Sequence, residues 1–158
     1  MSDDSPAMNQ IVIRPATPAE IPDMMRLTDH SATAAHWSRE QYDQIFHPSS
    51  LNRLAMVVQD TQGLQGFLIA RGILDEWEIE NIAISRPARR RGLGTRLLGE
   101  FLDQARARGA RAVFLEVRES NRAACALYEK WSFEESGRRP RYYSDPIEDA
   151  ILYRHTFA

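Results

Sequence analysis

One run of six residues near the middle of the chain, Arg89-Arg90-Arg91-Gly92-Leu93-Gly94, organises the rest of the sequence. The sequence pattern places this run directly after a strand and directly before a helix. The first backbone N–H groups of a helix have no intrahelical partner and carry partial positive charge. Glycines let a ligand approach the backbone, and the three arginines add full positive charges. The run therefore predicts a site that binds phosphate groups.

Two common phosphate-binding motifs do not fit this run. A P-loop needs a Gly-Lys-Ser/Thr sequence after its glycines, and none follows Gly94. The dinucleotide fingerprint needs a third glycine where this chain has Leu97, and it belongs to a first βαβ unit rather than to the end of an antiparallel hairpin. Taken alone, the run favours an exposed arginine-rich loop with a glycine turn over a phosphate-binding site. The neighbouring sequence motifs decide between these two interpretations.

The composition indicates a globular protein and excludes several classes. The chain has 158 residues, 43% of them hydrophobic and 27% charged, which suits one domain with its own core. Residues 1–9 are expected to form a disordered tail and residues 10–158 a single domain. A net charge of −2 argues against a nucleic-acid binder. The single cysteine indicates a reducing cytoplasm, and no apolar run is long enough for a membrane span. A signal peptide is not expected, because the first residues lack its basic and apolar regions. The four histidines lack metal-ligand spacing.

Periodicity and capping signals predict a mixed α/β chain without strict βαβ repetition. Strands are expected at residues 10–14, 54–58, 64–73, 76–85, 112–117, 134–138 and 149–157. Helices are expected after Thr17 to about residue 30, after Ser38 to a point before Pro48, from Gly92 to Gly109, and after Asn121.

Four further motifs occur in order around the arginine–glycine run: EIENIAI at 78–84, LEVRESN at 115–121, ALYEK at 126–130 and RRPRYY at 138–143. Together they resemble the GNAT superfamily of acetyl-CoA-dependent N-acetyltransferases, and within it the ribosomal-protein-alanine N-acetyltransferases of the RimI type. The resemblance covers nearly the whole chain. It implies an α/β (α+β) fold with a mixed, mostly antiparallel central sheet of six to seven strands, flanked by about four helices, in which the central strands splay apart.

The resemblance also implies how acetyl-CoA, the co-substrate, is bound. The coenzyme A pyrophosphate is expected at the helix start, where the binding residues would be Arg89, Arg90, Arg91, Gly92, Leu93, Gly94 and Thr95. The pantetheine arm is expected to lie like an added strand along the backbone of Ile82, Ala83 and Ile84 and to contact Asn121. Asn121 is also the predicted cap of its helix. No metal is expected.

Glu116 is the first candidate for the base that removes a proton from the acceptor amine. It points away from the face that carries Leu115 and Val117, on a strand expected in the centre of the sheet, where desolvation would raise its pKa toward the useful range. Its position alone equally allows a structural glutamate paired with Arg118. The resemblance implies that the glutamate of LEVR is the base, acting directly or through a water.

Tyr128 is the candidate acid. Its position on a helix, one turn after Ala124, favours a packed aromatic residue when considered alone. The resemblance reverses this preference, because it implies that the tyrosine of ALYEK gives a proton to the coenzyme A thiolate.

Glu78 and Glu80 compete with Glu116 for the role of base, since several branches of the family carry their base on this strand. The structural alternative for both is a solvated acidic face, and Glu80 is also a candidate for contact with a cationic amine. Cys125 is expected to be a small core residue rather than a nucleophile. Direct transfer in a ternary complex is therefore preferred to an acetyl-cysteine intermediate.

The acceptor site is expected near the RRPRYY segment, which is predicted to be a loop between the last two strands. Tyr142 and Tyr143 there would wall a slot for an extended peptide N-terminus, with Trp37 as the opposite wall, or would pack as ordinary surface aromatics. The resemblance implies a protein N-terminal α-amine as acceptor, most specifically the N-terminal alanine of a small-subunit ribosomal protein. The alternatives are other protein N-termini, a small-molecule amine, or a non-catalytic acyl-CoA-binding or partner-binding module. No direct contact with nucleic acid or membrane is expected.

One position departs from the family pattern. Leu-Gly-Phe usually follows the tyrosine helix, and this chain has Trp131-Ser132-Phe133. The glycine normally ends the helix in a left-handed conformation, which a serine adopts at a cost of about 1 kcal/mol.

Overall fold

The computed structural model describes residues 10–29, 35–49, 52–89 and 91–158. Its strands are β1 (Val12–Pro15), β2 (Arg53–Asp60), β3 (Gly63–Ile73), β4 (Glu76–Ile84), β5 (Ala112–Arg118), β6 (Glu134–Tyr143) and β7 (Glu148–Thr156). Its helices are the 3₁₀ turn η1 (Pro18–Glu20), α2 (Ile21–Asp29), α3 (Arg39–Ile45), α4 (Arg86–Arg89), α5 (Leu93–Ala107) and α6 (Arg122–Lys130). The predicted disordered tail and the position of Arg90 lie outside the described residues.

All seven strands form one sheet in the order β1-β2-β3-β4-β5-β7-β6. Neighbouring strands are antiparallel except for β4 and β5, which are parallel. This confirms the predicted fold class, a mixed and mostly antiparallel sheet with flanking helices.

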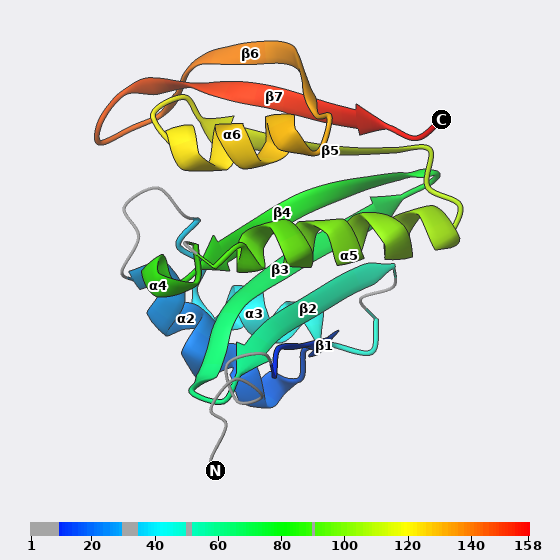
Figure 1. The fold of residues 1–158 in the computed structure, drawn as a ribbon. Helices are drawn as coiled ribbons and strands as arrows, with labels where there is room; N and C mark the ends of the chain where they lie inside the picture. The colour runs from blue at the N-terminus through cyan, green and yellow to red at the C-terminus, as the bar shows by residue number, and fades with distance from the viewer. Residues whose placement is uncertain (1–9, 30–34, 50–51, 90) are drawn as a thin grey trace.

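The two central strands separate, as the sequence predicts. Pairing between β4 and β5 is limited to the first residues of each strand and ends at Glu78 and Phe114 (Figure 1). In the pairing of β4 with β3, Ile69 lies opposite Asn81 and Ala70 opposite Ile79, so Glu80 is the extra residue of a β-bulge. A bulge bends its strand and increases the local twist. The bulge therefore accompanies the divergence of β4 from β5 just beyond their last paired residues.

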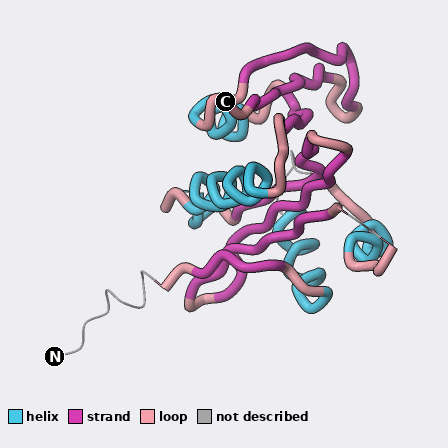
Figure 2. The backbone as a smooth tube through the Cα atoms, turned by 90° about the vertical axis from the view of Figure 1, so that its right-hand side faces the viewer, coloured by secondary structure: helices cyan, strands magenta, loops and turns pink. Residues whose placement is uncertain are grey.

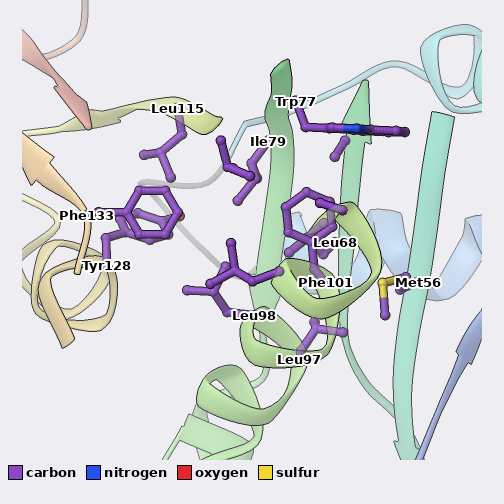
Figure 3. Packing of buried hydrophobic residues seen from close by; sticks show 14 of the residues in the cluster. Met56, Leu68, Trp77, Ile79, Leu97, Leu98, Phe101, Leu115, Tyr128 and Phe133 are labelled. Atoms are coloured by element: carbon purple, nitrogen blue, oxygen red, sulfur yellow. The ribbon is translucent and has the colours of Figure 1, made fainter. Parts of the chain in front are cut away.

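Helices cover both faces of the sheet (Figure 2). On one face, α5 buries the predicted apolar stripe, including Leu97, Leu98 and Phe101, against Trp77 and other residues of the sheet (Figure 3). The partly buried side chains of α6 pack against the same cluster, and Tyr128 lies within it. On the other face, α2 and α3 pack on the sheet through a separate cluster that includes Ile21 and Tyr42. Among the residues that the structure describes, no helix combines the length and apolar character that a membrane crossing requires.

Two expectations about local structure are wrong. A short helix, α4, follows β4 and contains Arg89, the first residue of the arginine–glycine run, because Ser85 Oγ accepts from the backbone N–H of Ala88 (3.4 Å) and Pro87 is compatible with a first helical turn. The RRPRYY segment, expected to be a loop, belongs to β6. This strand continues past Arg138 because Arg139 pairs with Ala150 and, after an irregularity, Tyr143 pairs with Glu148.

The end of α6 confirms the backbone conformation expected at Ser132. This residue has φ 64°, and the backbone N–H of Phe133 donates to the carbonyl oxygen of Tyr128 (3.0 Å). This hydrogen bond and the ring contact between Phe133 and Tyr128 (5.5 Å between centroids) belong to a Schellman motif. The left-handed position is thus occupied by a residue whose Cβ opposes that conformation.

We expect Ser132→Gly to raise the free energy of unfolding by up to about 1 kcal/mol, because glycine removes the Cβ that penalises positive φ. For a domain of this size, that gain corresponds to a Tm increase of about 2–4 °C. Thermal unfolding followed by circular dichroism measures the shift. Ser132→Ala is the matched control, since it keeps the Cβ and should give no increase. An unchanged or lower Tm for the glycine variant would contradict the assignment.

Candidate active site

A cavity of about 910 Å³ opens where β4 and β5 separate. It is lined by residues of β4, β5 and α6, by the start of α5, by the end of β6 and by the segment before α3. Of the predicted site residues, the cavity is lined by Glu80, Ile82, Ala83, Ile84, Arg89, Gly92, Gly94, Thr95, Glu116, Asn121, Tyr128, Tyr142 and Tyr143. The predicted site residues come from six different elements or their ends. The fold brings them to one cavity.

The start of α5 is open toward a ligand. Gly92 occupies the N-cap position with φ 72°, and no heavy atom lies within 4 Å of the place where a Cβ would stand. Gly94 packs closely on the end of β4, since an added Cβ would lie 3.4 Å from Ile84 Cγ1. Arg89 Nε donates to the carbonyl oxygen of Ile84 (3.0 Å), which fixes this arginine beside the helix start. The arrangement has the free backbone donors and the positive charge that phosphates require.

Two residues of the predicted phosphate site point elsewhere. The Arg91 guanidinium forms an ion pair with Asp60 (2.8 Å) in β2, and the side chain of Leu93 is fully buried in the core. Only their backbone groups are at the helix start. The structure thus separates Arg89, which lines the cavity, from its neighbour Arg91, which does not.

Glu116 lies on β5 and lines the middle of the cavity, with 22% of its side chain exposed. Its partner is not Arg118, the residue that the structural alternative proposed. Instead, Arg139 of β6, next to the irregular part of that strand, forms an ion pair with Glu116, with 2.8 Å between Nε and Oε1. Arg118 forms an ion pair with Glu148 (3.0 Å). The carboxylate therefore faces the cavity, and its counterion is an arginine whose side chain is 56% exposed.

Tyr128 lies on α6, which Asn121 caps by accepting from the backbone N–H of Ala124 (3.2 Å). The ring is packed between Phe133 and Tyr153 and is 3% exposed, yet it lines the cavity. Burial raises the pKa of the Tyr128 hydroxyl above its ordinary value of 10. The hydroxyl therefore keeps its proton throughout the neutral range. The packed aromatic and the proton donor are thus compatible descriptions of one residue.

Three aromatic side chains line part of the cavity. Tyr142 and Tyr143 meet edge to face with ring centroids 5.1 Å apart, and the Arg118 guanidinium lies 4.3 Å from the centre of the Tyr143 ring. Tyr142 is 54% exposed. Trp37, from the segment before α3, also lines the cavity and stacks at a tilt on Tyr42 (5.4 Å). The three aromatic residues suggested by the sequence are therefore brought to one cavity.

Glu80, the residue in the bulge, also lines the cavity, but it does not belong to a solvated acidic face. Its side chain is 16% exposed and forms an ion pair with Arg53 of β2. Burial raises the pKa of Glu80, against the opposing effect of Arg53 and Arg71. Glu78 is paired with Arg71 (3.1 Å). Glu80 therefore remains chemically competent as an alternative base.

Three residues of the site carried no recognisable signal in the sequence. Arg139 and Arg53 reach Glu116 and Glu80 from other strands. Asn81 is 3% exposed, lines the cavity and donates through Nδ2 to the Tyr42 hydroxyl (3.3 Å). Each contact joins residues that are far apart along the chain, so only the tertiary structure brings them together.

The environment of Cys125 is poorly suited to a nucleophile. Cys125 is partly buried against the core, and burial raises the pKa of its thiol, which disfavours the nucleophilic thiolate. Within residues 10–29, 35–49, 52–89 and 91–158, no group of three or more His, Cys, Asp or Glu side chains could hold a metal ion.

Comparison with known proteins gives a family and several relatives. The sequence model described as the acetyltransferase (GNAT) family matches residues 21–133. A ribosomal protein bS18-alanine N-acetyltransferase from Salmonella typhimurium is 36% identical over 126 residues, which are 78% of this chain and 83% of the relative. The enzyme of the same name from Escherichia coli is 43% identical over 91 residues, 56% of this chain. That match spans 62% of the Escherichia coli protein, less than two thirds of its length.

Solved structures give the same fold. The crystal structure of the ribosomal-protein-alanine N-acetyltransferase from Escherichia coli superposes with a TM-score of 0.83 at 29% identity, over 94% of this chain and 95% of the other. The similarity extends over almost the whole of both chains, including β6 and β7, which lie beyond the residues matched by the family model.

The environment of Tyr128 predicts its titration. Because burial raises its pKa, Tyr128 should not ionise below about pH 10, the ordinary value for a tyrosine. In a spectrophotometric titration, the wild type and Tyr128→Phe should therefore gain equal phenolate absorbance up to that pH. Tyr142→Phe, which removes a tyrosine that is 54% exposed, is the control for the substitution itself. A smaller absorbance gain for Tyr128→Phe below pH 9 would contradict the buried environment.

Proposed function

Because the chain belongs to the acetyltransferase (GNAT) family, we propose that it transfers the acetyl group of acetyl-CoA to a protein N-terminal α-amine. One observation carries this proposal. A single cavity joins a helix start suited to phosphate, a carboxylate on β5, a protonated tyrosine on α6 and an aromatic mouth. An acetyl transfer to an amine needs four parts, namely a coenzyme site, a base, an acid and an acceptor slot.

The residues at the start of α5 fit the coenzyme. The first N–H groups of α5, from Leu93 to Thr95, and the guanidinium of Arg89 would hold the pyrophosphate. The pantetheine arm would lie along Ile82, Ala83 and Ile84, because this part of β4 is beyond its pairing with β5. Bound acetyl-CoA supplies the activated acetyl thioester. A backbone N–H on the same edge of β4 would steady the oxygen that gains negative charge during transfer.

Glu116 and Tyr128 would move the protons. Glu116 accepts a proton from the acceptor nitrogen, directly or through a water, because only the neutral amine has a free electron pair for attack. Tyr128 donates its hydroxyl proton toward the departing sulfur, since its raised pKa keeps that proton in place at neutral pH. The raised pKa of Cys125 argues against an acetyl-cysteine intermediate, so transfer would be direct within a ternary complex.

The acceptor that we propose is the N-terminal alanine of a small-subunit ribosomal protein. The relatives from Salmonella typhimurium and Escherichia coli are named ribosomal protein bS18-alanine N-acetyltransferases, which supports this choice. The aromatic mouth formed by Trp37, Tyr142 and Tyr143 supports an extended peptide as ligand. A terminal α-amine has a pKa of about 8, against about 10.4 for lysine, so a carboxylate base deprotonates it more easily near neutral pH.

Two other functions remain alternatives. Other protein N-termini or a small-molecule amine would use the same base and acid. A non-catalytic acyl-CoA-binding or partner-binding module would need only the coenzyme part of the cavity. The presence of both Glu116 and Tyr128 on that cavity favours catalysis.

We expect Glu116→Gln to lower kcat at neutral pH by about 10²-fold or more, the usual contribution of a general base. The KM for acetyl-CoA should change little, because Glu116 is not at the start of α5. Steady-state kinetics with an alanine-initiated peptide measures both values. Glu119→Gln, at an exposed glutamate close in sequence, is the matched control and should retain full activity. If Glu116→Gln were active and Glu80→Gln inactive, the base would be Glu80.

Mass spectrometry after incubation with acetyl-CoA separates the candidate functions. A peptide with a free N-terminal alanine should gain one acetyl group on its α-amine, whereas the same peptide with a blocked N-terminus and an internal lysine should gain none. Preference for a free small-molecule amine over the peptide would contradict the peptide acceptor. Coenzyme binding without any acetylated product would favour the binding module.

A further inference from the structure

We propose that Arg139 occupies, in the free enzyme, the place where the α-ammonium group of the acceptor binds, and that the acceptor must displace it from Glu116. This inference rests on the proposed function, because it takes Glu116 as the base. It adds a residue that governs how the acceptor enters, and it defines the acceptor as a free cationic N-terminus.

The first argument is the contact itself. Arg139 Nε and Glu116 Oε1 are 2.8 Å apart, and Glu116 faces the cavity. Glu116 also has the next arginine of its own strand nearby, but Arg118 is committed to Glu148 (3.0 Å) and lies over the ring of Tyr143 (4.3 Å). Arg139 is therefore the cation on the carboxylate that would receive the acceptor proton.

The second argument is chemical. A guanidinium does not lose its proton in proteins, so Glu116 cannot take a proton from Arg139. An N-terminal ammonium has a pKa of about 8 and arrives mostly protonated at neutral pH. It can replace the guanidinium as counterion and then give one N–H proton to the Glu116 carboxylate. The products of this step are a neutral amine, which keeps the nitrogen electron pair, and a neutral carboxylic acid, so charge and protons balance.

The third argument is that Arg139 has somewhere to go. Its side chain is 56% exposed, and its guanidinium lies 5.6 Å from the centre of the exposed Tyr142 ring. Arg139 pairs with Ala150 and Tyr143 with Glu148, so residues 140–142 face Asp149 alone and form a wide irregularity in the ladder. The side chain can therefore leave Glu116 and remain over Tyr142, at the mouth that the acceptor uses, without breaking a regular strand pair.

Arg139→Gln tests the proposal, since glutamine removes the charge and keeps a polar side chain. The KM for an alanine-initiated peptide should fall about two- to fivefold, the factor that one partly exposed ion pair is worth. The KM for acetyl-CoA should stay unchanged. Arg138→Gln is the matched control, because Arg138 is the adjacent arginine of β6 and pairs with Glu119 (2.8 Å) and Glu135 (3.2 Å) instead. It should leave both KM values at the wild-type level.

Three results would overturn the proposal. The first is an unchanged or higher peptide KM for Arg139→Gln. The second is an equal fall for Arg138→Gln, which would show a general effect of charge. The third is a fall of kcat without a fall of peptide KM, which would make Arg139 a positioning residue that orients Glu116. A fully active Glu116→Gln enzyme would instead defeat the proposed base itself, so the two failures are distinguishable.

A direct observation complements the kinetics. The Arg139 Nε signal, assigned in the NMR spectrum by comparison with Arg139→Gln, should shift in Glu116→Gln, because that substitution removes the carboxylate that lies 2.8 Å away in the free protein. Adding the alanine-initiated peptide together with coenzyme A to the wild type should shift the signal in the same direction. A signal that keeps its free-protein position in the peptide-saturated protein would contradict the displacement.

Discussion

The site depends on the interruption of one strand pair. β4 and β5 are joined only as far as Glu78 and Phe114, and the bulge at Glu80 bends β4 away directly afterwards. If the ladder continued, the backbone N–H and C=O groups of β4 and β5 would bond to each other and leave no space between the two strands. Because it stops, the sheet contains a cavity in its middle while the antiparallel pairs on both sides keep it rigid. Because β4 and β5 do not pair there, their backbone groups are available to bind an extended ligand between them.

The charges of the cavity are arranged across strands. Glu80 of β4 pairs with Arg53 of β2, and Glu116 of β5 pairs with Arg139 of β6. Each carboxylate that could act as base is thus neutralised by an arginine from outside its own strand. The two pairs differ in exposure, since Arg53 is 21% exposed and Arg139 is 56% exposed. A cation at the surface exchanges more readily for a substrate than one held within the sheet, which favours Glu116 as the carboxylate that the acceptor reaches.

Tyr128 depends on the two ends of a short helix. Asn121 fixes the beginning of α6, and the Schellman motif at Ser132 and Phe133 fixes its end. The ring that would supply a proton is therefore held by local hydrogen bonds and by its packing with Phe133. The same packing removes water from the hydroxyl and keeps it protonated. Stability and chemistry at this residue have one physical origin.

The sequence by itself determined the parts of the protein that depend on neighbours along the chain. The apolar stripe of α5, the caps at Ser38 and Asn121, and the left-handed Ser132 are readable because their causes lie within one helical turn. The ordered motifs likewise indicated the family. Only the tertiary structure decided that Arg139 rather than Arg118 pairs with Glu116, that Arg53 reaches Glu80 from 27 residues away, and that Arg91 turns to Asp60. The ionic partner of a side chain is a charged group that the register of the sheet places within a few ångströms. That register is set by contacts over the whole chain.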